Sequence, residues 1–150
     1  MEERVAKLEA MLSLMTLEAE YARSWDTGDA DGWADVFTED GAFELAGSGD
    51  RPTRSYEGRA ALRDFCETFN AQWTGLHLMH VPQIAVEGET ATGRVHFEWT
   101  AVSRRDPNRT MQARVFGYYL ITYRNTPVGW RMLRRVEHGV GRAESRFDSL

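Results

Sequence analysis

The hydrophobic period of the chain changes in residues 76–104, which read LHLMHVPQIAVEGETATGRVHFEWTAVSR. From Leu76 onward the sequence consists of four long runs rich in Val, Ile, Thr and aromatic residues, the composition typical of β-strands. Turn-forming residues separate the runs at Glu87-Gly88-Glu89, Arg105-Asp106-Pro107-Asn108 and Thr126-Pro127-Val128-Gly129. Because connections this short join antiparallel neighbours, the second half of the chain is predicted to be an antiparallel meander.

Alternation within these runs separates an inner from an outer face, because successive residues of a strand point to opposite sides of a sheet. In the second run, polar and apolar side chains alternate, and we expect the polar set outside and the apolar set inside. The outer set is Arg94, His96 and Glu98, and the inner set is Val95, Phe97 and Trp99. Pro82 has no N–H to donate to a neighbouring strand, so it predicts an edge or a bulge in the first run.

The first half of the chain carries the period of helices instead. A stripe of apolar residues spaced three and four apart, on one helix face, is expected to face the core. Its members are Val5, Leu8, Leu12, Met15, Ala19 and Ala22, widened by Met11, Leu14 and Tyr21. Gly28 is predicted to end this helix, since glycine readily adopts the left-handed conformation, and Asp29 can cap a second short helix. That helix should bury Trp33, Val36 and Phe37, and a third helix should bury Leu62, Phe65, Cys66 and Phe69.

Between the second and third helices we expect a turn at residues 38–41, a short strand at 42–45 and a loop at 46–54. Helices first and long strands afterwards are typical of the α+β class. The predicted fold is a cone-shaped barrel of three N-terminal helices packed on a curved, mixed and mostly antiparallel sheet. Residues 1–140 should form one domain. Residues 141–150 should form a tail, which is either loose or docked on a partner subunit.

Composition excludes several functions. A net charge of −5 provides no concentrated basic face for nucleic acid. The single cysteine, Cys66, rules out an internal disulfide and suits a reducing compartment. No secretory signal and no 18-residue apolar run is evident, so we expect a cytoplasmic protein without a membrane anchor. The sequence shows neither the His/Asp/Glu spacing of a metal site nor a Gly-rich phosphate loop, so we expect no metal and no cofactor.

Several motifs occur in a telling order. The first is Tyr21-Ala22-Arg23-Ser24-Trp25-Asp26-Thr27-Gly28-Asp29, and it is followed by Trp33, Phe37 and Thr38-Glu39-Asp40-Gly41. The later motifs are Tyr56-Glu57-Gly58-Arg59, the strand start at His77, Glu87-Gly88-Glu89-Thr90-Ala91 and Gly129-Trp130-Arg131-Met132. Together they resemble SnoaL-like proteins, the polyketide-cyclase-like branch of the nuclear transport factor 2-like superfamily. The resemblance covers nearly the whole chain and implies the fold described above. That superfamily includes scytalone-dehydratase-like lyases, ketosteroid isomerases, polyketide cyclases, dioxygenase small subunits and binding modules, and the fold does not choose among them.

Asp26 and His77 are the candidate catalytic pair. Four residues beyond Ala22, the helix stripe reaches Asp26, and a carboxylate directed toward the core needs a partner or a raised pKa. Alternatively, Asp26 caps the turn at Gly28. A single strand histidine such as His77 is typical of a core or surface residue. The resemblance implies instead that Asp26 orients His77 as a general base, which requires the two side chains to lie within roughly 2.6–3.2 Å of each other.

The remaining pocket residues are predicted to be aromatic. Tyr21 is a candidate to polarise a substrate oxygen. The candidates for contact with the substrate are Trp25, Phe43, Tyr56, Trp99 and Phe116. For Tyr21, Trp25 and Tyr56, a purely structural role in the core or rim is the alternative. His80 is expected to face solvent, and His138 to lie at the rim or an interface.

The sequence does not identify the proton donor of the predicted site. Scytalone-dehydratase-like proteins place a second histidine on the penultimate strand, where this chain has Arg114-Val115-Phe116. A tyrosine that they carry near the first strand is replaced at about Leu45.

The leading hypothesis is therefore a cofactor-independent lyase or isomerase that acts on a small hydrophobic, cyclic molecule. A non-catalytic binding protein and an accessory subunit of a larger enzyme are the alternatives. A homodimer is also expected, because the outer face of the sheet should expose aromatic residues such as Tyr118 or Tyr119.

Overall fold

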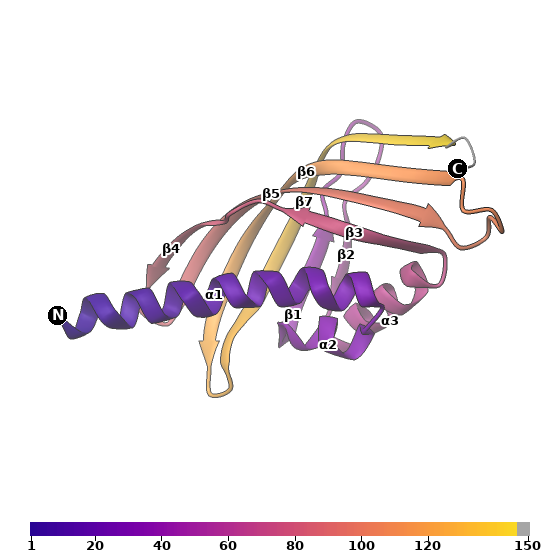
Figure 1. The fold of residues 1–150 in the computed structure, drawn as a ribbon. Helices are drawn as coiled ribbons and strands as arrows, with labels where there is room; N and C mark the ends of the chain where they lie inside the picture. Colours follow the sequence, from indigo (N-terminus) through magenta and orange to yellow (C-terminus); the bar gives the residue numbers. More distant parts are fainter. Residues whose placement is uncertain (147–150) are drawn as a thin grey trace.

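The computed structural model describes residues 1–146, which fold into three helices and seven strands. The helices are α1 (Glu2–Thr27), α2 (Ala30–Asp35) and α3 (Arg59–Asn70). The strands are β1 (Phe37–Leu45), β2 (Arg54–Glu57), β3 (Trp73–Met79), β4 (Gln83–Glu87), β5 (Thr90–Ser103), β6 (Met111–Thr126) and β7 (Gly129–Arg146). Figure 1 shows one curved sheet bent over the helices, with α1 running along its concave side.

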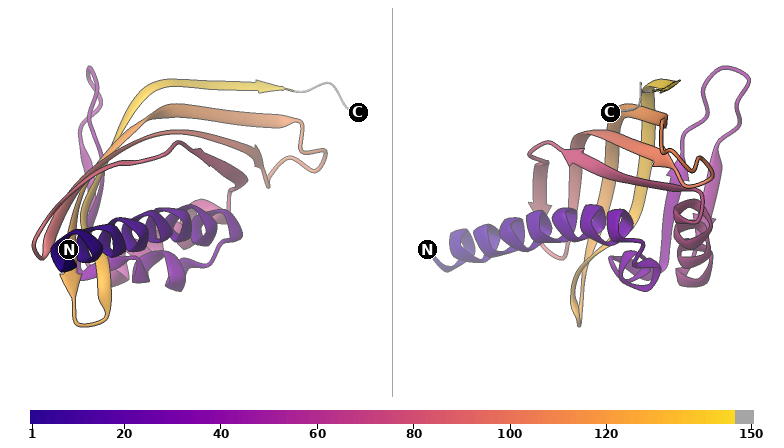
Figure 2. Two further views of the ribbon diagram at one scale, coloured as in Figure 1. Left: turned by 60° about the vertical axis from the view of Figure 1, so that its left-hand side comes forward. Right: turned by 45° about the vertical axis from the view of Figure 1, so that its right-hand side comes forward.

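The sheet has the order β2-β1-β7-β6-β5-β3, and β4 pairs with the other end of β5. Every pairing is antiparallel except that of β1 with β7, which is parallel. The predicted α+β fold, with helices on a mixed and mostly antiparallel sheet, is confirmed. The views in Figure 2 show that the strong bend of β5, β6 and β7 makes the concave side deep enough to enclose α1 and α3.

Local signals placed the helix ends well. Gly28 ends α1 in the left-handed conformation, with φ of 72°. The Asp29 Oδ1 atom accepts a hydrogen bond of 2.9 Å from the Gly32 N–H and so caps α2, as predicted. Trp33 and Phe37 are then fully buried.

The face of α1 that meets the core differs from the predicted stripe. The buried residues are Leu14, Leu17, Glu18, Tyr21, Ser24 and Trp25. Val5, Leu8, Leu12 and Met15 are exposed, because they lie on the side of α1 that turns away from the buried Leu14 and Tyr21. The first turns of α1 also extend past the end of the sheet (Figure 2). The widening residues Leu14 and Tyr21, rather than the stripe itself, identified the core-facing side.

Residues 38–41 are a second correction: they are part of β1 and do not form a turn. The pairing of β1 with β7 shifts register between Phe37 and Ala42, so the strand is kinked there. At Gly41 a Cβ atom would lie 2.9 Å from the Thr38 carbonyl oxygen and from the Phe37 Cβ, and only glycine fits this kink. The turn-like composition therefore marks a bulge.

Three further strand boundaries also differ. Arg54 begins the short strand β2, which the sequence did not reveal because it pairs only with the edge of β1. The first of the four runs is divided around Pro82 into β3 and β4, which both pair with β5. The predicted tail is strand up to Arg146, because β6 begins at Met111 and offers pairing partners that far. Residues 147–150 of that tail lie outside the described residues.

Alternation along β5 follows the prediction: Val95, Phe97 and Trp99 are buried. On β6, Tyr118 lies on the outer face, whereas Tyr119 is buried on the concave side. No helix within residues 1–146 combines the length and the apolar character that a membrane crossing requires.

Candidate active site

A cavity of about 120 Å³ lies between the concave face of the sheet and helices α1 and α3. Its lining is mainly aromatic. The apolar lining residues are Trp25, Phe43, Leu45, Phe65, Phe69, Phe97, Trp99 and Val115, and the polar ones are Tyr21, Arg54, His77, Tyr119, Glu137 and Arg142. An aromatic wall with a few convergent polar groups is typical of a small-molecule site.

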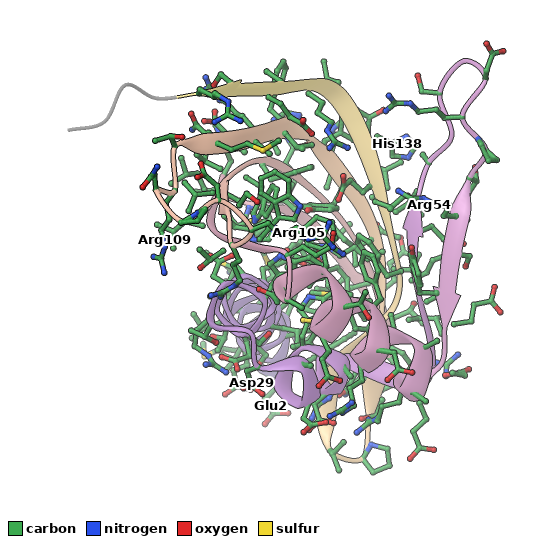
Figure 3. The ribbon with its side chains drawn as sticks, turned by 90° about the vertical axis from the view of Figure 1, so that its right-hand side faces the viewer. Glu2, Asp29, Arg54, Arg105, Arg109 and His138 are labelled. Atoms are coloured by element: carbon green, nitrogen blue, oxygen red, sulfur yellow. The ribbon has the colours of Figure 1, made fainter. Side chains whose placement is uncertain are left out.

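The cavity continues into a wider outer vestibule of about 580 Å³. Both spaces share the lining residues Leu45, Arg54, Val115, Glu137 and Arg142. The outer walls come from the loop after β1 and from the last part of β7. Figure 3 shows Arg54 on the side of β2 that faces this region. A ligand can therefore reach the inner cavity past a neck that carries charged side chains.

The structure brings Asp26 and His77 together at the inner cavity. The Asp26 Oδ1 atom lies 2.7 Å from His77 Nδ1, within the predicted range. The other carboxylate oxygen, Oδ2, accepts a hydrogen bond of 2.8 Å from the backbone N–H of His77. Asp26 is the last core-facing residue of α1 before Gly28, and His77 is the fifth residue of β3, so the carboxylate joins the helix end to the strand.

This clamp fixes the tautomer of His77. Both Asp26 oxygens accept, so Nδ1 carries the proton that it donates, and Nε2 keeps its lone pair. The His77 side chain is 5% exposed and lines the cavity, whereas Asp26 lies behind it, against the back of the ring. The turn-capping alternative for Asp26 is not what the structure shows.

Burial lowers the pKa of His77 below its ordinary value of 6.5, because the cavity provides little solvation for imidazolium. The hydrogen bond and charge of Asp26 oppose this shift, and the nearby positive charge of Arg135 reinforces it. At neutral pH His77 is therefore uncharged and able to accept a proton at Nε2.

Tyr21 lies against the histidine, with its ring centroid 5.9 Å from that of His77. Burial raises the pKa of the Tyr21 hydroxyl, so the hydroxyl keeps its proton. Tyr119, in contact with Tyr21 at 5.8 Å between centroids, behaves in the same way. The cavity thus contains phenolic O–H groups that can donate to a substrate oxygen.

A buried ion pair supports these tyrosines from behind. Arg135 Nη1 lies 2.8 Å from both carboxylate oxygens of Glu18, and the Tyr123 hydroxyl donates to Glu18 Oε1 at 2.7 Å. The guanidinium carbon of Arg135 lies 3.8 Å from the ring centroid of Tyr21 and 3.9 Å from that of Tyr119. Within the described chain, Nε and Nη2 of Arg135 have no hydrogen-bond partner, so its charge is stabilised by Glu18 and by the two ring faces.

Glu137 is a cavity residue that the sequence analysis missed. It is paired directly with Tyr119 across β6 and β7, and the Tyr119 hydroxyl donates to Glu137 Oε2 at 3.4 Å. Burial raises the pKa of Glu137 to about 7. In the sequence, only the position of Glu137 on the last strand, two residues after Arg135, pointed to the cavity. The bulges of β7 make it hard to infer which of its side chains face inward.

The predicted contact residues divide into two groups. Trp25, Phe43 and Trp99 line the inner cavity, as does Tyr21. Tyr56 lies behind the wall, where it stacks on Phe65 with 4.0 Å between ring centroids.

Phe116 is a correction: it is 46% exposed on the outer face, because side chains alternate along β6 and its neighbours Val115 and Gly117 take the inward positions.

The other histidines lie on the outer face. Tyr118 stacks on His138 at 4.9 Å and contacts His96 at 6.3 Å, while His80 is exposed. A shallow depression of about 560 Å³ on this face includes His138 but neither Asp26 nor His77. Among residues 1–146 no group of three or more His, Cys, Asp or Glu side chains is arranged to hold a metal ion.

Comparison with known proteins agrees with this architecture. The sequence matches the family model of the SnoaL-like domain over residues 6–136. No curated protein matches the chain.

Similar solved structures include that of Rv3472, a protein of unknown function from Mycobacterium tuberculosis. Its sequence is 28% identical to this chain, and the two structures match with a TM-score of 0.75 over 92% of this chain and 74% of that one. A proposed aromatic ring hydroxylase from Novosphingobium aromaticivorans is also 28% identical, with a TM-score of 0.78 over 93% of this chain and 94% of that one. A proposed scytalone dehydratase from the same organism is 16% identical, with a TM-score of 0.76 over 99% and 93%, and its likeness shows the fold alone.

Proposed function

The chain belongs to the family of SnoaL-like domains, and we propose that it is a cofactor-independent lyase or isomerase that removes a proton from carbon in a small, hydrophobic, cyclic substrate. The observation that carries this proposal is the two-point clamp of Asp26 on His77. It leaves Nε2 of a neutral imidazole at the wall of an apolar cavity. A neutral imidazole held by a carboxylate is a suitable general base near pH 7.

In the proposed reaction, His77 Nε2 takes a proton from a carbon next to a carbonyl group. Asp26 stabilises the imidazolium that forms, and the cavity excludes water that would weaken this interaction. The developing negative charge on the substrate oxygen needs donors, and the Tyr21 hydroxyl is available for it.

The size of the inner cavity supports a single ring as the reacting part of the substrate. An apolar cavity of about 150 Å³ holds benzene in a well-studied case, and the cavity here is about 120 Å³. Larger substituents would extend through the neck into the vestibule.

Deuterium exchange tests the proposed proton abstraction without the natural substrate. Cyclohexanone is a single-ring ketone of the kind proposed for the reacting part of the substrate, and its α-hydrogens exchange with D₂O once a base removes them. The wild-type protein should accelerate this exchange about 10²-fold or more over buffer, followed by mass spectrometry. The rate should fall as the pH is lowered through the depressed pKa of His77, since imidazolium has no lone pair. Exchange no faster than in buffer would favour the non-catalytic binding protein, and stable copurification with a larger enzyme would favour the accessory subunit.

We also propose that the chain forms a homodimer through the outer face of its sheet. This face exposes Leu76, Leu78, Phe116 and Leu120, side chains that a monomer would leave in water. Sedimentation at micromolar concentration should give twice the mass of one chain, and Phe116→Arg should shift the species toward one chain. Val128→Asp, at the exposed tip of the β6–β7 hairpin, is the matched control and should stay dimeric. A wild-type mass of one chain would contradict the proposal.

A further inference from the structure

We propose that Glu137 is the proton donor of this site, giving its proton to a departing hydroxyl group while His77 takes a proton from the adjacent carbon. This inference rests on the proposed function and specifies it as dehydration of a cyclic β-hydroxy ketone.

Glu137 occupies the neck of the pocket. It is one of five residues that line both the inner cavity and the outer vestibule. His77 lies on β3 and Glu137 on β7, and the two intervening strands β5 and β6 separate them in the sheet. Because the sheet is concave, both side chains reach the same small cavity. A substrate ring bound there would lie near both a base and a carboxyl group.

The Glu137 carboxyl group has weak compensation for its burial. Within residues 1–146 it forms no ion pair, and its side-chain hydrogen bond is the long one from Tyr119. By contrast, Glu18 on the same side of the sheet contacts Arg135 with both oxygens, and Glu44 contacts Arg134. A carboxyl group desolvated without a close cation favours its protonated form.

The groups that face Glu137 come from α1, β2, β3, β6 and β7. They are Tyr21, Arg54, His77, Tyr119, Arg135 and Arg142. The positive charges of Arg135 and Arg54 and the Tyr119 hydrogen bond lower the pKa of Glu137, but burial outweighs them and brings it to about 7. Arg142 is engaged by Glu144 at 2.6 Å.

The environments of the two groups thus shift their pKa values in opposite directions. Burial lowers the pKa of the base, His77, and raises that of the acid, Glu137. Near neutral pH the cavity therefore contains an unprotonated imidazole together with a carboxyl group whose raised pKa favours its protonated form. This is the protonation state that an elimination requires, and such pairs of titratable groups identify acid and base assignments.

His77 Nε2 takes the proton, and the C–H electron pair forms the carbon–carbon double bond. The C–O bond breaks with its electron pair going to oxygen, and the Glu137 carboxyl proton joins that oxygen, so water departs. The products are an enone, water, imidazolium and the Glu137 carboxylate. Transfer of the imidazolium proton to the carboxylate through water restores the starting state.

Two probes separate the base from the acid. Cyclohexanone has no leaving group, so its deuterium exchange needs only the base, His77. Dehydration of 3-hydroxycyclohexanone to 2-cyclohexenone needs both His77 and Glu137, and ultraviolet absorbance measures its rate. Glu137→Gln keeps the shape but cannot release a carboxyl proton. It should lower the dehydration rate about 100-fold or more, and at least about tenfold more than it lowers exchange. Glu98→Gln, on the outer face of β5, is the matched control and should leave both rates unchanged.

The pH profile provides a second readout. Wild-type dehydration should decline as the pH rises through about 7, where Glu137 loses its proton, and Glu137→Gln should lack this decline. Equal losses of dehydration and exchange in Glu137→Gln, or a decline that persists in the variant, would overturn the assignment. If wild-type exchange is absent, the proposed role of His77 fails instead, which distinguishes the two failures.

A third measurement needs no substrate. In protein labelled with ¹³C at the glutamate carboxyl groups, one resonance should titrate near pH 7 and be missing from Glu137→Gln. If every glutamate carboxyl titrates below about pH 5, near the ordinary range, Glu137 is not the proton donor.

Discussion

Asp26→Asn is expected to lower the rate of deuterium exchange by about 10²-fold, to near the rate in buffer, while the protein stays folded. Asp26 accepts two hydrogen bonds from His77, one from the backbone N–H and one from Nδ1–H. Asparagine has a single acceptor oxygen, so its amide N–H₂ would face one of these donors. The ring would lose its fixed tautomer, and the imidazolium would lose the negative charge that stabilises it.

The measurement is the exchange rate, with circular dichroism and thermal unfolding to verify the fold. One donor left unsatisfied should cost about 1–3 kcal/mol of the free energy of unfolding. Asp31→Asn is the matched control, because Asp31 is exposed on α2 and pairs with Arg63 at the surface; its exchange rate should equal that of the wild type. An Asp26→Asn protein that keeps more than a tenth of the wild-type rate would show that the clamp is not needed for proton abstraction.

Arg135→Met is expected to destabilise the fold by about 3–5 kcal/mol. Arg135 is fully buried and Glu18 is 4% exposed, so removing the guanidinium leaves a carboxylate deep in the core with only the Tyr123 hydroxyl. The stack on Tyr21 and Tyr119 would be lost as well. Urea unfolding followed by tryptophan fluorescence measures the difference.

Two comparisons make this result specific. Arg134→Met, at the next position of β7, removes a half-exposed pair with Glu44 and should cost no more than about 1 kcal/mol. The double variant Glu18→Leu/Arg135→Met should be more stable than Arg135→Met, because no unpaired charge remains in the core. If Arg134→Met and Arg135→Met are equally destabilising, burial of the pair does not contribute as described.

The sequence was sufficient for the fold and for the pair Asp26 and His77. Turn residues between apolar runs act locally, so Gly28, Asp29 and the three hairpin turns could be found from short segments. The resemblance linked Asp26 to His77, two residues 51 positions apart whose contact no local pattern could reveal.

It was harder to predict which side chains of the long strands and of α1 face the core. The exposed stripe on α1 has the same spacing as the buried one, and only the packing of the helix against the sheet decides which of the two is covered. Phe116 was expected inside because alternation defines two sets of residues on β6, and the sequence does not show which set faces the helices. The register shifts opposite Phe116 and Thr122 insert extra residues into β7, where they reverse which side chains face inward. Glu18, Arg135 and Glu137 are charged residues on elements that otherwise bury apolar ones. Their roles depend on tertiary neighbours, and these neighbours are absent from the local sequence.

The most direct test of the proposed chemistry is cyclohexanone exchange in D₂O by His77→Gln beside the wild type, at pH 7 and equal protein concentration. Glutamine occupies similar space at the cavity wall but cannot act as the base. If His77 removes the proton, the wild type should exchange the α-hydrogens about 10²-fold or more faster than His77→Gln, and the variant should match buffer. A folded His77→Gln protein that exchanges within threefold of the wild-type rate would contradict the assignment of His77 as the general base.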